Sequence, residues 1–372
     1  WGPYLAERAW GTVREDYSAS GEAWEHLGHD QSRSRVYRWN EDGLGGICDE
    51  RQRLCFAFAL WNSRDSILKE RAFGLTGNQG NHGEDVKEYY FYLDATPSHS
   101  YLRYLYKYPQ AEYPYGRLVE ENGLRGRQDP PFNLLDTGVF QDNRYWDVDV
   151  SYAKAGPEEI HICINVANRG PESATLHLLP QLWFRNTWAW GDEEKERALA
   201  ELQGDPILPD QKPDKPILRA MMAPAGASWA VRAEHPTLGV YHLYGRQPAE
   251  PLYTENEHNA QRLWEHANAS PYVKDSFHRR VVNGERDAVN PACEGTKFAA
   301  WHVLTVDGGQ QAEIELVLSA APLAQAFAAT AAVFADRRSE ADGFYRDLLP
   351  ESSDEDRRIL RQASAGMIWS KQ

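Results

Sequence analysis

The stretch Glu159-Ile160-His161-Ile162-Cys163-Ile164-Asn165-Val166-Ala167 decides the fold class. Its isoleucines and Val166 occupy every second position, so they share one face of an extended strand. The residues between them, His161, Cys163 and Asn165, share the other face. One face is apolar and the other is more polar, which is typical of a strand that packs one side against a core. The stretch therefore predicts a half-buried strand of an antiparallel sheet.

Similar strand signals recur along the chain as far as about residue 320. With the stretch above, the pattern predicts strands at residues 53–60, 88–93, 145–152, 159–167, 176–184, 228–233, 239–244, 299–306 and 312–318. Turn-forming Gly, Pro, Asn and Asp residues separate these segments, and few helical patterns lie between them. Successive strands of this kind predict an all-β domain over residues 1–320, a large antiparallel super-β-sandwich.

Three regions depart from this pattern. Residues 1–50 are polar and loop-like, and we expect an N-terminal arm that either is held by ion pairs or contacts substrate. A charged run at 192–197 predicts a short helix before a Pro-rich loop, and residues 259–268 predict a second brief helix. Both interruptions are interpreted as insertions at one edge of the sandwich.

The periodicity becomes helical after Pro322. Residues 323–345 are rich in alanine and predict one helix. Ser352 and Glu355 form a candidate capping box for a second helix, whose apolar face comprises Ile359, Leu360, Ala363, Met367 and Ile368. The sequence stops where a helical region begins, so we expect residues 321–372 to be a linker in a fragment of a larger protein.

Composition limits the partners. The chain has 372 residues with 42% hydrophobic and 26% charged content, as ordinary globular proteins have. A formal net charge of −15 without a basic patch argues against nucleic acid. No apolar run is long enough to span a bilayer and the first ten residues are not a signal peptide, so we expect a cytoplasmic protein with no membrane partner. The 13 Trp and 19 Tyr residues are typical of large sheets and of carbohydrate sites.

The motif search favours neither a metal site nor a cofactor. The four cysteines are widely spaced and no Cys-x-x-Cys occurs, so free thiols are expected rather than a disulfide or metal site. His82-Gly83-Glu84 matches the His-x-Glu of zinc deaminases, but the Pro-Cys-x-x-Cys partner is absent. We expect no cofactor and no bound metal.

Two stretches have the composition of a sugar site. Residues 77–94 combine a glycine-rich, carboxylate-bearing loop with a Tyr-rich strand, and residues 183–191 combine tryptophans with Arg185 and Asn186. Aromatic rings stack on the C–H faces of sugars, and polar groups bind their hydroxyls. The alternatives remain a solvated loop before an ordinary strand, and a strand end covered by indoles.

Eight segments together resemble the mannosyl-oligosaccharide glucosidases of glycoside hydrolase family sixty-three, in a microbial and fungal branch. The matching segments are residues 10–17, 38–43, 60–62, 68–71, 80–90, 182–188, 270–275 and 365–372. The resemblance implies an N-terminal β-sandwich joined by linker helices to an (α/α)6 barrel. In such enzymes the barrel holds both carboxylates of an inverting mechanism on α-linked sugars.

Neither catalytic carboxylate has a counterpart among residues 1–372, so the resemblance implies that no catalytic residue lies here. The partners that it implies are a carbohydrate substrate and the chain's own C-terminal (α/α)6 domain. The candidate substrate-binding residues are Arg14, Asp16, Tyr17, His29, Asp30, His82, Glu84, Asp85, Lys87, Glu88, Tyr89 and Trp188. One alternative is a non-catalytic carbohydrate-binding or scaffold module. The other is a hydrolase that uses Asp16, Glu84 or Asp85 itself.

Overall fold

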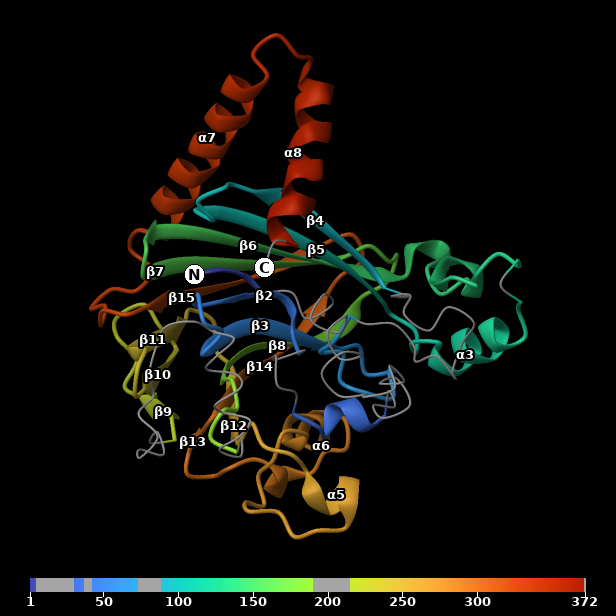
Figure 1. Cartoon of the computed structure of the whole chain (residues 1–372), viewed down its shortest axis with the longest axis vertical. Helices are drawn as coiled ribbons and strands as arrows, with labels where there is room; N and C mark the ends of the chain where they lie inside the picture. The colour runs from blue at the N-terminus through green and yellow to red at the C-terminus, as the bar shows by residue number, and fades with distance from the viewer. Residues whose placement is uncertain (5–29, 37–41, 73–87, 127, 190–214, 371–372) are drawn as a thin grey trace.

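The computed structural model describes residues 1–4, 30–36, 42–72, 88–126, 128–189 and 215–370, and within them two antiparallel sheets face each other (Figure 1). Sheet A has the strand order β1 (Gly2–Tyr4), β2 (Leu44–Cys48), β3 (Leu54–Trp61), β8 (Ala174–Phe184), β14 (Lys297–Val306) and β12 (Glu250–Thr254). Sheet B has the order β13 (Glu294–Gly295), β9 (Ile217–Met221), β10 (Trp229–His235), β11 (Gly239–Gly245), β15 (Gln311–Ser319), β7 (Glu159–Asn168), β6 (Tyr145–Gly156), β5 (Tyr101–Pro109) and β4 (Tyr89–Ala95). The predicted all-β sandwich is confirmed.

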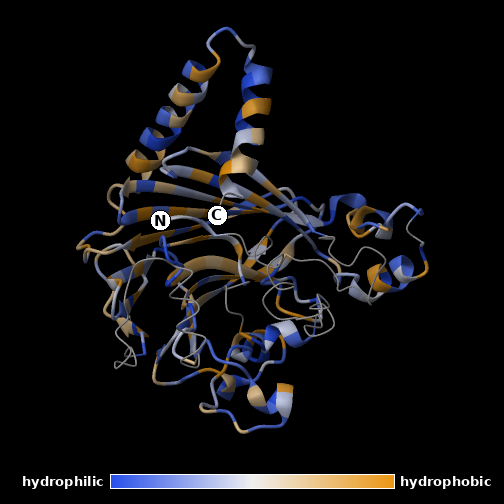
Figure 2. Cartoon of the chain, viewed as in Figure 1, coloured by the Kyte–Doolittle hydropathy of each residue, from blue (hydrophilic) through white to orange (hydrophobic). Residues whose placement is uncertain are grey.

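The stretch that decides the fold is β7, near the middle of sheet B. Its isoleucines and Val166 are fully buried in the core between the sheets, as the alternation predicts. Ile164 pairs with Val150 of β6 on one side and with Ile314 of β15 on the other, so apolar residues line up across the sheet. Figure 2 shows hydrophobic residues gathered on the strands of both sheets. Burial of this shared apolar face holds the two sheets together.

Each of the nine predicted segments contains a strand, and six strands were not predicted. The prediction of a loop-like arm for residues 1–50 is wrong at β1 and β2. In β2 the glycines hide the strand signal, and Gly45 has a physical role there. Its φ is +57°, and a Cβ would lie 2.7 Å from the Tyr104 ring, so only glycine lets β2 approach sheet B. In β12 the signal is weakened by Pro251, which is tolerated because this strand forms the edge of sheet A.

The described part of the chain also contains seven short helices. They are η1 (Gln31–Arg33), α3 (Tyr115–Gly123), η3 (Leu134–Thr137), η4 (Gln141–Asn143), α5 (Ala260–Trp264), α6 (Ser276–Val281) and η5 (Arg286–Ala288). The predicted helix at 259–268 is present as α5, which is shorter because its N-cap is Asn259 and Glu265 ends it in a left-handed conformation. The predicted helix at 192–197 lies outside the described residues.

Two longer helices, α7 (Thr330–Leu348) and α8 (Asp354–Trp369), form a hairpin that projects from sheet B on the side away from α5 and α6 (Figure 1). The first helix begins later than predicted. The predicted capping box is wrong by one position, since the Ser353 hydroxyl, not that of Ser352, accepts from the Asp356 amide at 3.1 Å. Among the described residues, no helix is both long and apolar enough to cross a bilayer.

The base of the hairpin is anchored at β4, the edge strand of sheet B. The Trp369 ring stacks on Tyr92, with centroids 5.5 Å apart and planes at 18°, and its Nε1 donates to the Asp94 carbonyl at 3.0 Å. The Tyr345 hydroxyl donates to the Ala95 carbonyl at 2.6 Å, and Arg361 pairs with the Asp94 carboxylate at 2.5 Å. The hairpin thus covers an edge that would otherwise offer unpaired backbone groups.

Candidate functional site

A short segment beside β3 organises the candidate site. Lys69 pairs with Leu60 through two backbone hydrogen bonds of 2.8 Å, which extends sheet A by one residue pair. The next carbonyl, that of Glu70, accepts from the Gly43 amide at 2.6 Å. The side chains of successive residues in an extended chain point to opposite sides, so the side chains of Lys69 and Glu70 lie in two different environments. Together with Arg71 they form three consecutive charged side chains that are almost completely buried.

Lys69 belongs to a buried group of charges and phenols, here called the Lys69 cluster. Its Nζ lies 2.7 Å from Oε1 of Glu88, whose other oxygen accepts from the Tyr106 hydroxyl at 2.5 Å. The ammonium also lies 3.9 Å from the Tyr113 ring centroid. The cluster comprises Asp65, Lys69, Glu88, Tyr106, Tyr108, Tyr113 and Tyr115. A buried ammonium with a carboxylate and aromatic faces around it is held by direct pairing in place of water.

Asp65 is the second carboxylate of the Lys69 cluster. Its Oδ2 accepts from the hydroxyls of Tyr108 at 2.9 Å and Tyr115 at 3.3 Å. Burial raises the pKa of Asp65 from 3.8 to about 6, although nearby Lys69 and the Tyr108 hydrogen bond oppose that rise. This carboxyl group therefore changes charge near neutral pH.

The raised pKa predicts a pH-dependent stability. Between pH 3.8 and about 6 the folded chain holds a proton on Asp65 that the unfolded chain has lost. The stabilisation is therefore complete below 3.8 and is lost as pH rises through 6, an effect on the order of 2–3 kcal/mol. The measurement is the free energy of unfolding in urea, for the wild type and for Asp65→Asn, between pH 3.8 and about 6. The wild type should lose stability relative to the variant as pH rises, and a constant difference would contradict the assignment.

The neighbouring charges form a second group, here called the Arg71 network, which comprises Asp42, Glu70, Arg71, Lys274 and Lys297. Arg71 donates to Asp42 at 2.7 Å and to Glu70 at 2.6 Å. Lys274 reaches the second oxygen of Asp42 at 2.6 Å, and Lys297 lies 3.4 Å from Glu70. Every buried carboxylate in this network thus has two cationic partners.

The pKa values reflect this balance. Burial favours the neutral form of Glu70, but Lys297 and Arg71 outweigh burial and lower its pKa to about 2. For Lys274, burial lowers the pKa to about 8 although Asp42 opposes that change. The Glu70 carboxylate is therefore charged at neutral pH, while Lys274 begins to lose its proton just above neutral pH.

The Arg71 network continues into the segment from Glu255 to Asp275. The Lys274 amide donates to the Glu257 carbonyl at 2.9 Å, and the Glu257 carboxylate accepts from Trp188 Nε1 at 2.9 Å. Asp275 accepts from the Ser34 hydroxyl at 2.5 Å. Residues from η1, the start of β2, the end of β3, the end of β8 and the loops around α5 are thus tied into one set of contacts.

This arrangement fixes the residues that border the undescribed segments. Asp42 follows residues 37–41, and Glu88 follows residues 73–87. Lys215, which follows residues 190–214, pairs with Glu257 at 2.7 Å and lies 5.6 Å from the Trp188 ring centroid. Asp30, which follows residues 5–29, pairs with Arg262. The residue that follows each of these four segments is therefore held by an ion pair.

Four of the predicted site residues lie within the described chain. Glu88 is a buried member of the Lys69 cluster, and Trp188 is half-buried beside Glu257. Tyr89 packs edge-on against Phe140, with centroids 5.8 Å apart. Asp30 is exposed and pairs with Arg262. The remaining predicted residues, Arg14, Asp16, Tyr17, His29, His82, Glu84, Asp85 and Lys87, lie outside the described residues.

Apart from Glu88, the buried charges were not predicted as site residues. A signal was present in residues 68–71, where three consecutive charged residues follow a leucine and directly precede an apolar pair. Charged residues at the end of a core strand need partners, because unpaired charges are costly to bury. Their partners Asp42 and Lys274 lie far apart in the sequence, and only the fold brings them together.

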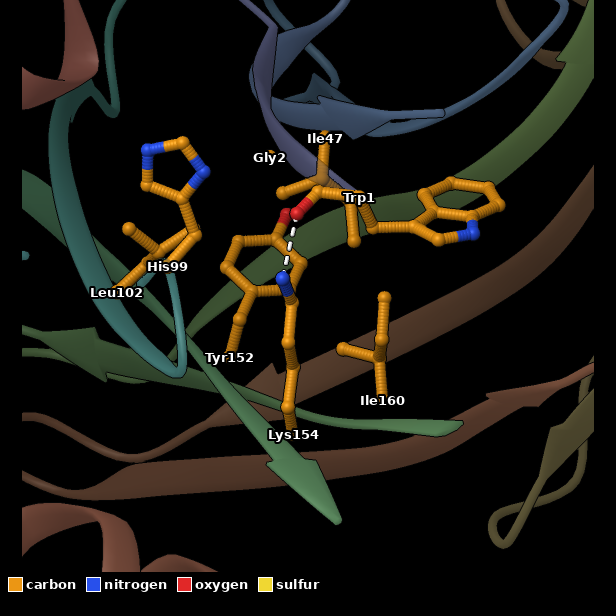
Figure 3. A pocket seen from close by; sticks show the side chains of 8 residues that line it. All are labelled: Trp1, Gly2, Ile47, His99, Leu102, Tyr152, Lys154 and Ile160. Carbon is orange, nitrogen blue, oxygen red and sulfur yellow. Dashed lines mark hydrogen bonds between the residues drawn. The ribbon is translucent and has the colours of Figure 1, made fainter. Parts of the chain in front are cut away.

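A separate small hollow lies near Trp1 (Figure 3). It is lined by Trp1, Gly2, Ile47, His99, Leu102, Tyr152, Lys154 and Ile160. Nζ of Lys154 donates to the Trp1 carbonyl at 2.5 Å, and burial lowers the pKa of this lysine. The lining has no carboxylate, so it does not supply the acid and base that glycoside hydrolysis needs.

Among the described residues no group of three or more His, Cys, Asp or Glu side chains could hold a metal ion.

Comparison with known proteins finds one informative sequence relative. No family model matches the chain. The chain is 40% identical to an uncharacterized protein of Saccharomyces cerevisiae over an alignment of 402 residues. That alignment covers all of this chain and 36% of the yeast protein, so the chain spans little more than a third of its relative's length.

Two solved structures match the chain weakly. A polysaccharide lyase has 9% identity and a TM-score of 0.29, covering 72% of this chain and 25% of the lyase. A galactose mutarotase related enzyme from Lactobacillus acidophilus has 9% identity and a TM-score of 0.26. The match covers 71% of this chain and 87% of that enzyme. Likeness at this level supports no argument about function.

Proposed function

We propose that the chain is the N-terminal β-sandwich portion of an inverting α-glycosidase of the glucosidase type. In this proposal residues 1–320 form the sandwich, residues 321–372 link it to an (α/α)6 domain, and that domain supplies both catalytic carboxylates. The sandwich then has a supporting role, in which it shapes the entrance of the sugar site and binds the neighbouring domain.

One observation carries the proposal. Residues from four of the segments whose sequence resembles the glucosidase family are tied together by contacts, although these four segments are far apart in the sequence. Asp42, Glu70, Arg71 and Lys274 come from three of these segments and form one buried ion network. Trp188 comes from a fourth and connects to that network through Glu257. A rigid, buried set of charges is suited to fix the loops that leave it in one geometry.

The paired carboxylates of the Arg71 network and of the Lys69 cluster do not suit catalysis. A glycosidase acid must reach the glycosidic oxygen, and its partner must reach water or the anomeric carbon. Asp42, Glu70 and Glu88 are instead buried and already paired with cations. This supports a structural role for the described carboxylates, and hydrolysis then depends on residues elsewhere in the protein.

The isolated chain is therefore expected to show no hydrolysis of an aryl α-glucoside, whereas the full-length protein should be active. In a titration with α-linked glucose disaccharides, His82→Ala and Trp188→Ala should each weaken binding about tenfold, which corresponds to about 1.4 kcal/mol. Phe344→Ala is the matched control, because Phe344 lies on α7, which projects from sheet B on the side away from α5 and α6, and it should leave the affinity unchanged.

Two other outcomes would change the proposal. If no sugar binds but the chain associates with the rest of the protein, the sandwich is a scaffold between domains. If the purified chain hydrolyses the aryl α-glucoside, the proposal is wrong, and Asp16, Glu84 and Asp85 become the first candidates for the catalytic acid and base.

A further inference from the structure

The hairpin of β2 and β3 holds two cysteines directly opposite each other. In the register of these strands, Cys48 faces Cys55. The adjacent pair is a hydrogen-bonded one, because the Asp49 amide donates to the Leu54 carbonyl at 3.4 Å. Pairs alternate along an antiparallel ladder, so the two cysteines occupy a non-hydrogen-bonded pair, where Cα atoms lie about 4.5 Å apart. That separation falls within the range of about 4.4–6.8 Å found for disulfides.

The two side chains also share one environment. Both belong to a small buried cluster with Tyr4, Ala57 and Trp183 on the face of sheet A that points away from the inter-sheet core. Cys55 is fully buried, while Cys48 is 6% exposed. Burial raises the pKa of the Cys55 thiol, and a hydrogen bond with Cys48 raises it further. Cys48 is the more accessible of the two thiols.

The remaining cysteines have no such arrangement. Cys163 in β7 lies opposite Ser151 of β6 and Glu315 of β15. Cys293 lies in the turn before β13, with its sulfur 3.8 Å from the Pro291 carbonyl. All four cysteines of the chain lie in the described residues, and all four are free thiols in the structure. Cys48 and Cys55 are the single facing pair among them.

We propose that Cys48 and Cys55 form a reversible cross-strand disulfide, which makes the β2–β3 hairpin a site of redox modification. The oxidant is a low-molecular-weight disulfide such as oxidised glutathione. The Cys48 thiolate attacks it and releases one glutathione thiolate. The Cys55 thiolate then attacks the Cys48 sulfur and releases the second. The two protein thiols lose two electrons and two protons, and the oxidant becomes two glutathione thiols.

The disulfide would link the end of β2 to the start of β3, next to the turn that joins them. Cys48 of β2 is also the partner of Gly2 in β1, so β2 lies between β1 and β3. β3 in turn leads to the buried charges at residues 69–71. Closing the hairpin covalently restricts the unfolded chain and is expected to raise the unfolding midpoint of the oxidised protein.

Peptide mapping provides the test. The chain is incubated with oxidised glutathione at about pH 8, where more thiolate is present, and is then alkylated in denaturant and digested with trypsin. Arg51 and Arg53 lie between the two cysteines, so trypsin places them on separate peptides. The expected result is a loss of two hydrogens in the intact mass, two alkylated thiols where the reduced chain has four, and one linked pair of peptides that dithiothreitol separates.

Four variants supply the controls. Cys163→Ser and Cys293→Ser should leave the linked peptides unchanged. Cys48→Ser should abolish them, and Cys55→Ala tests the same point with a smaller apolar side chain at the fully buried position. Four alkylated thiols after prolonged oxidation, or glutathione retained on Cys48 without the linked peptides, would overturn the proposal.

Discussion

Lys69→Met is expected to destabilise the fold by about 3–5 kcal/mol, the range for breaking a buried ion pair from one side. The side chains of Lys69 and Glu88 are 2% and 4% exposed, and their charged atoms are 2.7 Å apart. Methionine fills similar space without a charge, so the variant leaves Glu88 and Asp65 without the ammonium beside them. The measurement is the free energy of unfolding in urea at neutral pH.

A double-mutant cycle with Glu88→Gln separates pairing from packing. The double variant should recover part of the lost stability, because it buries neither charge of the pair. The deficit of Lys69→Met should also shrink as pH falls, since protonation removes the charge of a stranded carboxylate. Arg103→Met is the matched control. It breaks a pair with Asp149 in which the arginine is 46% exposed, and it should cost less than about 1 kcal/mol. Equal costs for the two single variants would refute the distinction.

Trp369→Ala is expected to detach α8 from the sandwich. The ring is 1% exposed and stacks on Tyr92, and such a truncation costs about 3–5 kcal/mol. A helix of this length is marginal without tertiary contacts, so detachment should also unfold it. Hydrogen exchange of the α8 amides should therefore become faster, while that of β7, in the middle of sheet B, stays slow.

Two variants on the same helix sharpen this test. Met367→Ala removes a side chain that is 76% exposed and should leave exchange in α8 unchanged. Trp369→Phe keeps a stacking ring but removes the Nε1 hydrogen bond to the Asp94 carbonyl, so its effect should be intermediate. If Trp369→Ala and Met367→Ala gave the same exchange rates, the ring would not anchor the helix.

The fold class could be predicted because most strands bury one face only. Alternation in β7 and β15 is visible in the sequence because an apolar core and a more polar surface impose it. β5 shows the same alternation in Leu102, Tyr104, Tyr106 and Tyr108, so its signal was present and was missed. β2 and β9 are short and lack a clear alternation, and their pairing is set by neighbouring strands that no local pattern reveals.

The candidate site was less predictable, for a physical reason. Glu88 was selected as a polar residue beside a Tyr-rich strand, but sequence gives no indication that its charge is buried against Lys69. Asp42, Arg71 and Lys274 acquire their role only through contacts between distant segments. Local composition detects residues that suit a sugar. It does not separate the side chains that touch ligand from those that hold the protein together.

The pairs Lys69–Glu88 and Arg71–Asp42 have a consequence for protein engineering. They clamp both borders of residues 73–87, which run between Ala72 and Glu88. Both ends of this stretch are held by buried contacts. Changes in its sequence and length are therefore expected to be tolerated, since the free energy of closing a loop changes only slowly with its length. Libraries that replace these residues while keeping both ion pairs should therefore yield folded variants.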